Sequence, residues 1–216
     1  MQEQKDIIDY YDKIATNYAA KIQDEFAPNQ FERVLIREFA LEVLHRGKVI
    51  DVGCGSGQIT DFLSKHKITD LVGIDMSSQM IHIAKEQYPL LQFEVADLQQ
   101  LPYPDHSFGA VLAFYSMIHF DEEQLKIAFQ EIKRTLSANG QFLLAFHTGN
   151  SIRHLDQYVD HPVSIDFYFY EIGHIMELLI ALGFEIIDIM EQPNPSALEN
   201  GSKRAYIWSQ YNPSLL

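Results

Sequence analysis

The 216-residue sequence contains one cysteine, Cys54, and no apolar run long enough to cross a membrane. A single cysteine excludes an internal disulfide and is typical of a reducing compartment. The longest apolar stretches, such as residues 178–184, are far shorter than the roughly 18 residues that a spanning helix requires. The start of the chain has neither a basic segment nor a long apolar one, as a secretory signal would. We therefore expect a cytoplasmic protein without a membrane span.

Positive charge is also scarce. Lys and Arg number 16 against 30 Asp and Glu, which gives a formal net charge of −14 and a pI near 4.9. Such a surface repels a phosphate backbone, and no stripe of Lys and Arg overrides it locally, so we expect no nucleic-acid partner. Hydrophobic residues make up 47% of the chain. This length and composition predict one domain over residues 1–216 around one core.

The most informative stretch that is present is residues 49–60, VIDVGCGSGQIT. Its apolar start predicts a buried strand, and three alternate glycines follow before a new apolar pattern begins. Gly53, Gly55 and Gly57 leave the loop nearly without side chains, so the backbone can turn sharply and a ligand can lie against it. The helix predicted from about Gln58 adds unpaired N–H groups and a positive dipole end. This stretch predicts a site for a nucleotide-like ligand.

Predicted strands and helices alternate through the chain. The predicted strands are residues 49–52, 71–74, 91–95, 110–114, 141–146, 184–190 and 205–209, and the predicted helices are residues 3–21, a segment from Pro28 to Gly47, and residues 57–66, 77–87, 122–136 and 169–182. Ser77 or Ser78 and Asp121 are expected helix caps. The alternation predicts a parallel sheet with helices on both faces. The first two helices either only cover the sheet or close over the ligand through Tyr10, Tyr11 and Tyr18.

Residues 147–168 show no clean period and contain Gly149, Pro162 and several charges. We expect a long, irregular insertion on the substrate side there, and long connections at a ligand edge are often lids. The expected organisation is then a pair of helices that form part of the lid (residues 1–46), a ligand-binding core (47–146), this insertion, and a final helix with strands (169–216). A polar, proline-bearing stretch, residues 191–202, leads to the last strand.

The glycine spacing distinguishes between two kinds of ligand. A dinucleotide fingerprint has glycines at relative positions one, three and six, whereas here they occupy one, three and five, with Gln58 at the sixth. Asp51 stands two residues before the first glycine, where a carboxylate opposes a pyrophosphate and attracts an ammonium group. Asp75, at the end of the second strand, suits the two ribose hydroxyls. A positively charged amino-acid nucleoside therefore fits better than NAD.

These residues resemble the class I S-adenosylmethionine-dependent methyltransferases, most closely the branch with the ubiquinone- and menaquinone-biosynthesis enzymes and many small-molecule methyltransferases, known as the methyltransferase type 11 branch. The matching segments are residues 10–22, YYDKIATNYAAKI; 49–60; 72–86, VGIDMSSQMIHIAKE; 93–120, FEVADLQQLPYPDHSFGAVLAFYSMIHF; and 139–146, NGQFLLAF. The resemblance implies a Rossmann-like, doubly wound, seven-stranded and mostly parallel sheet. The antiparallel last strand, residues 205–209, would insert beside the sixth.

The resemblance also implies S-adenosylmethionine as cofactor and S-adenosylhomocysteine as product. The residues that would bind the cofactor are Tyr18, Asp51, Gly53, Cys54, Gly55, Gly57, Asp75, Met76, Ala96, Asp97, Leu98, Phe114 and Tyr115. The glycine loop would hold the methionine portion, and Tyr18 its carboxylate end. Asp97 would meet the adenine amino group, although a turn cap is the alternative for this residue. Cys54 lies inside the loop and is a poor candidate for a nucleophile.

Displacement at a sulfonium methyl needs in-line positioning and exclusion of water, and a base only if the acceptor must lose a proton. His119, just after the fourth strand, is the first candidate base and His147 the second. For each, a hydrogen-bonded loop histidine is the alternative. His147, His154 and His161 have neither a helical spacing nor cysteine partners, so we expect no metal.

The acceptor is expected to be a small molecule, and the aromatic residues 167–170 favour an apolar or aromatic one. The fourth strand ends AFYSM and lacks the Asn/Asp-Pro-Pro-aromatic sequence of base and glutamine methylation, and no further cysteine is present for RNA carbon methylation. The sequence is compatible with a monomer or a homodimer. Two alternatives stay open: a catalytically silent S-adenosylmethionine-binding regulatory module and an NAD-linked reductase.

Overall fold

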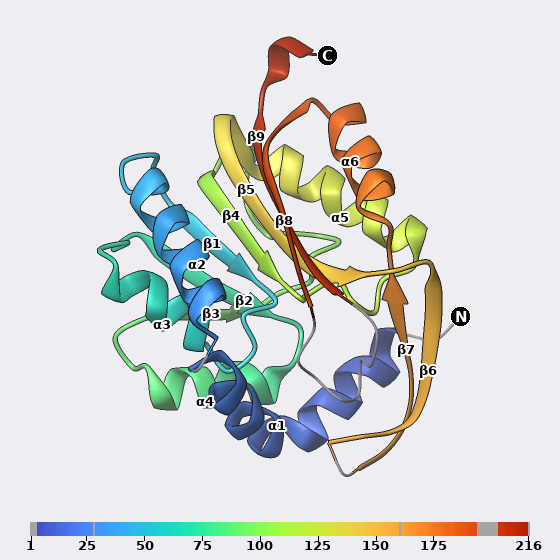
Figure 1. The fold of residues 1–216 in the computed structure, drawn as a ribbon. Helices are drawn as coiled ribbons and strands as arrows, with labels where there is room; N and C mark the ends of the chain where they lie inside the picture. The colour runs from blue at the N-terminus through green and yellow to red at the C-terminus, as the bar shows by residue number, and fades with distance from the viewer. Residues whose placement is uncertain (1–3, 28, 160, 194–202, 216) are drawn as a thin grey trace.

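A seven-stranded sheet forms the centre of the structure, a computed structural model that describes residues 4–27, 29–159, 161–193 and 203–215 (Figure 1). The strand order is β3-β2-β1-β4-β5-β9-β8. The strands are β1 (Val49–Val52), β2 (Leu71–Asp75), β3 (Gln92–Val95), β4 (Phe108–Phe114), β5 (Leu136–Thr148), β8 (Phe184–Pro193) and β9 (Lys203–Tyr211). The first five strands of this order, β3, β2, β1, β4 and β5, run parallel to one another. Strand β9 lies between β5 and β8 and is antiparallel to both. The predicted fold class is confirmed, including the inserted last strand.

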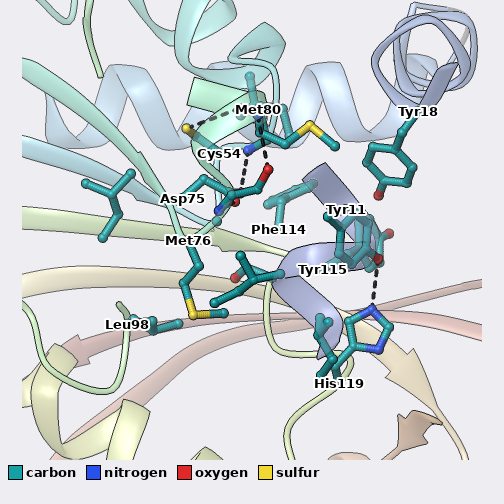
Figure 2. Close-up of a pocket in the computed structure, with 18 of the residues that line it drawn as sticks. Tyr11, Tyr18, Cys54, Asp75, Met76, Met80, Leu98, Phe114, Tyr115 and His119 are labelled. Carbon is teal, nitrogen blue, oxygen red and sulfur yellow. Dashed lines mark hydrogen bonds between the residues drawn. The ribbon is translucent and has the colours of Figure 1, made fainter. Parts of the chain in front are cut away.

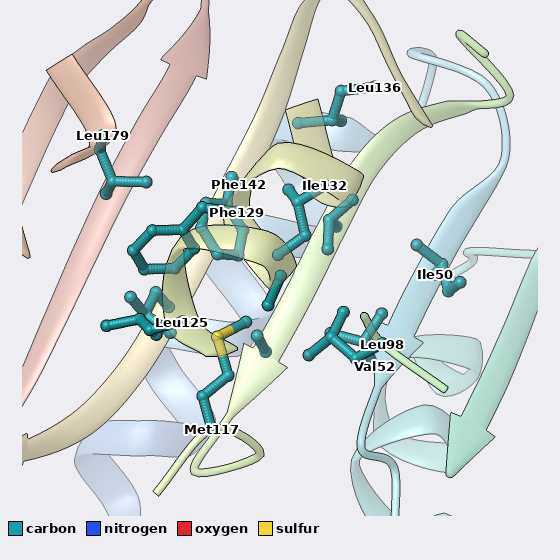
Figure 3. Packing of buried hydrophobic residues seen from close by; sticks show 14 of the residues in the cluster. Ile50, Val52, Leu98, Met117, Leu125, Phe129, Ile132, Leu136, Phe142 and Leu179 are labelled. Atoms are coloured by element: carbon teal, nitrogen blue, oxygen red, sulfur yellow. The ribbon is translucent and has the colours of Figure 1, made fainter. Parts of the chain in front are cut away.

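The buried side chains of the central strands alternate between two hydrophobic clusters. In β1, Val49 belongs to one cluster and Ile50 to the other, as successive side chains of a strand point to opposite faces. Helices α5 and α6 cover the face of Ile50, and α2 and α3 cover the face of Val49. Figure 3 shows Phe129 of α5 and Phe142 of β5 packed together on the first face. Burial on both faces explains the nearly continuous apolar strands of the sequence.

The helices are α1 (Gln4–Phe26), α2 (Gln30–Val43), α3 (Gln58–Lys65), α4 (Ser78–Gln87), α5 (Glu122–Thr135) and α6 (Ile172–Ala181), followed by a short 3₁₀ turn, Pro213–Leu215. The predicted caps are confirmed: Ser77 caps α4, and Asp121 forms a capping box with Gln124 at the start of α5. Asn29 caps α2, while Pro28 lies outside the described residues. Among the helices that the structure describes, none is long and apolar enough to cross a membrane.

The prediction that residues 147–168 form an irregular connection is wrong. The chain forms an antiparallel hairpin there, β6 (Ser151–Tyr158) and β7 (His161–Phe169), in a separate two-stranded sheet. Ile165, Phe167 and Phe169 alternate with more exposed residues, and the apolar face packs against α1. Because β7 continues to Phe169, α6 begins at Ile172 instead of at residue 169.

Other predicted boundaries shift by a few residues. Helix α1 continues to Phe26 instead of ending at residue 21, and β5 begins at Leu136 and passes through Asn139, which has a φ of +64°. The polar stretch 191–202 begins as the end of β8, and residues 194–202 lie outside the described part of the chain. Figure 1 shows α1 and the hairpin at the same edge of the sheet, the edge where the parallel strands end.

Candidate functional site

A cavity of about 180 Å³ lies at the carboxyl ends of β1, β2 and β4, beneath α1. Of the residues predicted to bind a ligand or act as a base, those that line the cavity are Tyr18, Gly53, Cys54, Gly55, Asp75, Met76, Ala96, Leu98, Phe114, Tyr115 and His119. The structure thus brings together residues from the first 120 positions of the chain. Asp51, Gly57, Asp97 and His147 are not among the lining residues.

The glycine loop turns sharply at the floor of the cavity. Gly53 has a φ of +70°, and a Cβ built there would lie 2.2 Å from Cβ of Ser116, so only glycine fits. Gly55 has a φ of +54°, and a Cβ there would meet no atom within 4 Å, because its side faces open space. Gly57 serves packing, since a Cβ there would lie 2.7 Å from the Phe93 ring. The loop therefore offers bare backbone to a ligand at Gly55.

Asp75 connects the loop to α4. Its Oδ2 accepts the N–H of Gly55 at 3.0 Å and its Oδ1 accepts the N–H of Ser77 at 2.8 Å. Burial raises the pKa of this carboxyl, against the lowering effect of the two backbone N–H donors. Each carboxylate oxygen carries a second lone pair, so Asp75 is fixed in place with acceptor capacity toward the cavity. Two ribose hydroxyls are donors that suit this arrangement.

Asp51 lies behind the loop instead of on the cavity wall. Its Oδ2 accepts the hydroxyl of Thr60 at 2.6 Å, and the residue is buried. Burial raises the pKa of Asp51 to about 7. The carboxylate thus ties β1 to α3. Asp51 does not line the cavity, where a ligand ammonium group would have to contact it.

Asp97 makes a turn-capping contact, the alternative that the sequence offered to a contact with the adenine amino group. Its Oδ1 accepts the N–H of Gln99 at 2.8 Å. Its Oδ2 accepts the side-chain amide of Gln4 at 3.1 Å, and Gln4, which lines the cavity, also contacts the sulfur of Met76 at 2.8 Å. An amide N–H₂ group therefore occupies Asp97 where an adenine amino group is expected.

Helix α1 is held over the cavity by Asp12. The Asp12 carboxylate accepts the Ser77 hydroxyl at 2.5 Å and the N–H of Gln79 at 3.1 Å, at the start of α4. A carboxylate at a helix amino terminus also interacts favourably with the helix dipole. These contacts keep Tyr11 and Tyr18 on the cavity wall.

His119 is hydrogen-bonded at both ring nitrogens, and Figure 2 shows the bond to Tyr11. Nδ1 lies 2.8 Å from the backbone oxygen of Asp166, which only accepts, so Nδ1 carries the proton. Nε2 then accepts the Tyr11 hydroxyl at 2.8 Å. Burial lowers the pKa of His119 to about 4, and burial raises the pKa of Tyr11 well above its usual value. His119 is therefore neutral at pH 7, with its lone pair directed at Tyr11.

His147 is buried and supports Tyr115. The two rings are stacked with centroids 5.0 Å apart, and burial together with the Arg204 charge lowers the pKa of His147 to about 3. Tyr115 has a φ of +54°, an uncommon value for a large side chain that persists only where its surroundings fix it. His147 thus acts on the cavity through Tyr115. Among the described residues, no group of three His, Cys, Asp or Glu could hold a metal ion.

The sequence analysis missed a buried polar cluster at the end of the cavity. We define the Glu32 cluster as Glu32, Tyr115, Arg204 and Tyr206. Oε1 of Glu32 accepts the hydroxyl of Tyr115 at 2.6 Å, the hydroxyl of Tyr206 at 2.7 Å and Nη1 of Arg204 at 3.3 Å. Glu32 and Arg204 both line the cavity.

The sequence offers one misleading signal for Glu32. It stands three residues after the cap Asn29, a spacing that predicts a capping box. Its side chain instead turns into the fold toward Arg204, which is 172 positions away in the chain. No local pattern could have paired these two residues.

Comparison with known proteins gives matches to methyltransferases. Residues 49–140 match a family model described as a methyltransferase domain. Over 141 residues the chain is 27% identical to the uncharacterized methyltransferase YcgJ of Bacillus subtilis, an alignment that covers 63% of this chain and 54% of that protein. The chain thus spans about half the length of this curated relative.

Solved structures share the fold at low sequence identity. An S-adenosylmethionine-dependent methyltransferase from Clostridium acetobutylicum superimposes with a TM-score of 0.71 and 18% identity, covering 91% of this chain and 99% of that one. The [4+2]-cyclase SpnF superimposes with a TM-score of 0.61 and 20% identity, covering 82% of this chain and 81% of that one. The fold is therefore found in a structure named for a reaction other than methyl transfer.

Proposed function

Because the chain belongs to the class I S-adenosylmethionine-dependent methyltransferase family, we propose that it binds S-adenosylmethionine and transfers a methyl group to a small molecule. The observation that carries this proposal is the cavity itself. It joins the bare backbone of Gly55 and the fixed carboxylate of Asp75 to a second end lined by Tyr11, Tyr18 and His119. One end suits an adenosyl group, and the other would face the acceptor.

The residues present fit the cofactor. Asp75 would accept the ribose hydroxyls, while Met76, Ala96 and Leu98 give the adenine an apolar wall. Asp97 would take the adenine amino group in place of the Gln4 amide. When bound, S-adenosylmethionine supplies a methyl group on a positively charged sulfur. A nucleophilic atom of the acceptor would attack the methyl carbon, and the sulfur would leave as a neutral thioether.

The Tyr11–His119 pair would receive a proton from the acceptor. The tautomer of His119 places its lone pair on Nε2, against the Tyr11 hydroxyl, so a proton given to Tyr11 can pass to His119. A base with a pKa of about 4 suffices for an oxygen acceptor, because a hydroxyl oxygen that has just gained a methyl group is a far stronger acid than an imidazolium. Asp166 would stabilise the resulting imidazolium through its backbone oxygen.

The acceptor is proposed to be apolar or aromatic. Ile7 and Ile8 of α1 and Phe120 line the cavity beside the tyrosines. The hairpin adds Ile165 and Phe167, which pack against Tyr10 and Ile14 of α1. Aromatic walls of this kind bury a flat ligand and leave polar recognition to a few groups.

The test measures product formation as well as binding. The protein is incubated with S-adenosylmethionine carrying a labelled methyl group and a library of small aromatic and aliphatic acceptors, and both labelled product and S-adenosylhomocysteine are quantified. We expect labelled product from at least one acceptor class, and at least about tenfold less of it from the Asp75→Ala variant at a subsaturating concentration of S-adenosylmethionine. Tight binding of S-adenosylhomocysteine without product from any acceptor would favour the catalytically silent module. Binding of NAD without binding of S-adenosylhomocysteine would favour the reductase.

A further inference from the structure

We infer that Glu32 and Arg204 bind the amino-acid end of the cofactor, with Glu32 receiving the ammonium group and Arg204 the carboxylate. The inference rests on the proposed function, because it concerns the cofactor named there. It assigns a role to the Glu32 cluster, whose two charged members line the cavity and whose contacts link α2, Tyr115 just after β4, and β9.

The charges on the cavity wall support this assignment. Among the described residues that line the cavity, Arg204 is the one with a permanently positive side chain. A carboxylate that enters a protein of net charge −14 requires a local cation, and a guanidinium has five N–H donors in a planar fork that matches it. Arg204 is therefore the residue whose chemistry fits a ligand carboxylate.

The complementary ammonium group needs a carboxylate on the same wall. Asp51 lies behind the glycine loop on Thr60, and Asp75 is bonded to two backbone N–H groups at the ribose position. Glu32 is the remaining acidic residue on the wall among the described residues. Its three contacts from the cluster all reach Oε1, so a ligand would meet Oε2.

The cluster lies next to the glycine loop in the sheet. Strand β4 pairs with β1, with Asp51 opposite Leu112, so the end of β4 and Tyr115 after it come two to three residues beyond this pair, as the glycine loop does after β1. Tyr115 donates to Glu32, and the Arg204 guanidinium lies 5.1 Å from the centre of its ring. A ligand whose adenosyl group is bound at Asp75 and whose chain crosses the loop is thus directed toward the cluster.

Fixed geometry separates a binding role from an incidental ion pair. Burying a charged pair is costly in free energy, and apolar residues of similar size often replace such pairs without loss of stability. Here Glu32 and Arg204 are both buried, and the αL conformation of Tyr115 is held by Ala145, His147 and Glu32. Groups that are fixed before the ligand arrives bind it at a lower entropic cost.

The test compares two ligands that differ only at the amino-acid end. 5′-Methylthioadenosine has the adenosine and thioether of S-adenosylhomocysteine without its ammonium and carboxylate groups. Calorimetry is carried out with both ligands on the wild type, on Glu32→Gln, and on Glu38→Gln, a control that removes the same charge from an exposed position of the same helix. We expect Glu32→Gln to weaken S-adenosylhomocysteine binding about tenfold while 5′-methylthioadenosine changes less than about twofold, and Glu38→Gln to change neither.

Other outcomes overturn the inference. Equal weakening of both ligands would mean that Glu32 only supports the fold, and no change in either would mean that the cluster faces something other than the cofactor. If Glu32→Gln does not fold, the same two titrations are carried out on Arg204→Lys, with the same selective weakening expected. Equal affinity of the wild type for the two ligands would by itself contradict the inference. A wild type that binds neither ligand removes the proposed function as well, so the two failures are distinguishable.

Discussion

Replacing Asp75 by alanine separates the part of this carboxylate that supports the fold from the part that binds a ligand. The variant removes the acceptor of two backbone N–H groups, those of Gly55 and Ser77. A buried donor without a partner costs about 1–3 kcal/mol. Removal of a carboxylate whose pKa is raised by burial recovers part of that cost, so we expect the free energy of unfolding to fall by about 1–3 kcal/mol.

The effect on binding is expected to be larger than a loss of stability alone explains. Hydrogen bonds to a charged acceptor contribute about 1.5–3 kcal/mol each, and loss of one such bond corresponds to a weakening of at least about tenfold. Calorimetry with S-adenosylhomocysteine measures this change, and urea unfolding measures the stability of the same sample. Asp105→Ala is the control, because it removes an exposed carboxylate that pairs with Arg134 before the start of β4. A folded Asp75→Ala variant with unchanged affinity would remove Asp75 from the site.

Two further predictions concern the titratable groups. Tyr11→Phe should lower turnover at least about tenfold without changing S-adenosylhomocysteine affinity, because it removes the hydroxyl between the cavity and His119; Tyr10→Phe, one residue earlier, is the control, and equal turnover in the two variants refutes the relay. Asp51→Asn should raise the free energy of unfolding at pH 8 by at most about 4 kcal/mol, with the gain shrinking toward pH 4. The sign follows because the folded protein holds the Asp51 proton up to about pH 7 while the unfolded chain releases it near pH 4, so wild-type stability falls across that window. Urea unfolding at several pH values measures the difference, and an equal pH dependence in both proteins would contradict it.

The part of the cavity wall at the glycine loop and Asp75 could be predicted because its residues are local in sequence. Gly53, Gly55 and Asp75 belong to one strand–helix–strand unit, β1 to β2, in which the strand ends are brought to one edge of a parallel sheet. The glycine spacing and the position of Asp75 therefore carry most of the geometry. Asp51 shows the limit of this reasoning: its place in the sequence is next to the loop, yet the side chain points to Thr60.

The hairpin was missed although its pattern is present. Val163, Ile165, Phe167 and Phe169 alternate with polar or smaller residues, which is the period of a strand. Pro162 and the charged residues before it obscured the pattern, and an isolated two-stranded hairpin is at best marginally stable. The hairpin is stabilised here by packing against Tyr10 and Ile14 of α1, a contact between segments about 150 residues apart.

The difference between contacts that are local in the sequence and contacts between distant segments explains why the methyl donor can be inferred from sequence and the acceptor cannot. The proposed adenosyl half of the donor site is built from consecutive elements, so a short motif specifies it. The proposed acceptor side combines α1, the loop after β4 and the hairpin, and its key contacts join Tyr11 to His119 and His119 to Asp166. Each of these residues alone fits an ordinary helix or strand position, and only their meeting in the folded chain gives the cavity its chemistry. A change of acceptor therefore requires changes in these distant segments, while the glycine loop and Asp75 can stay the same.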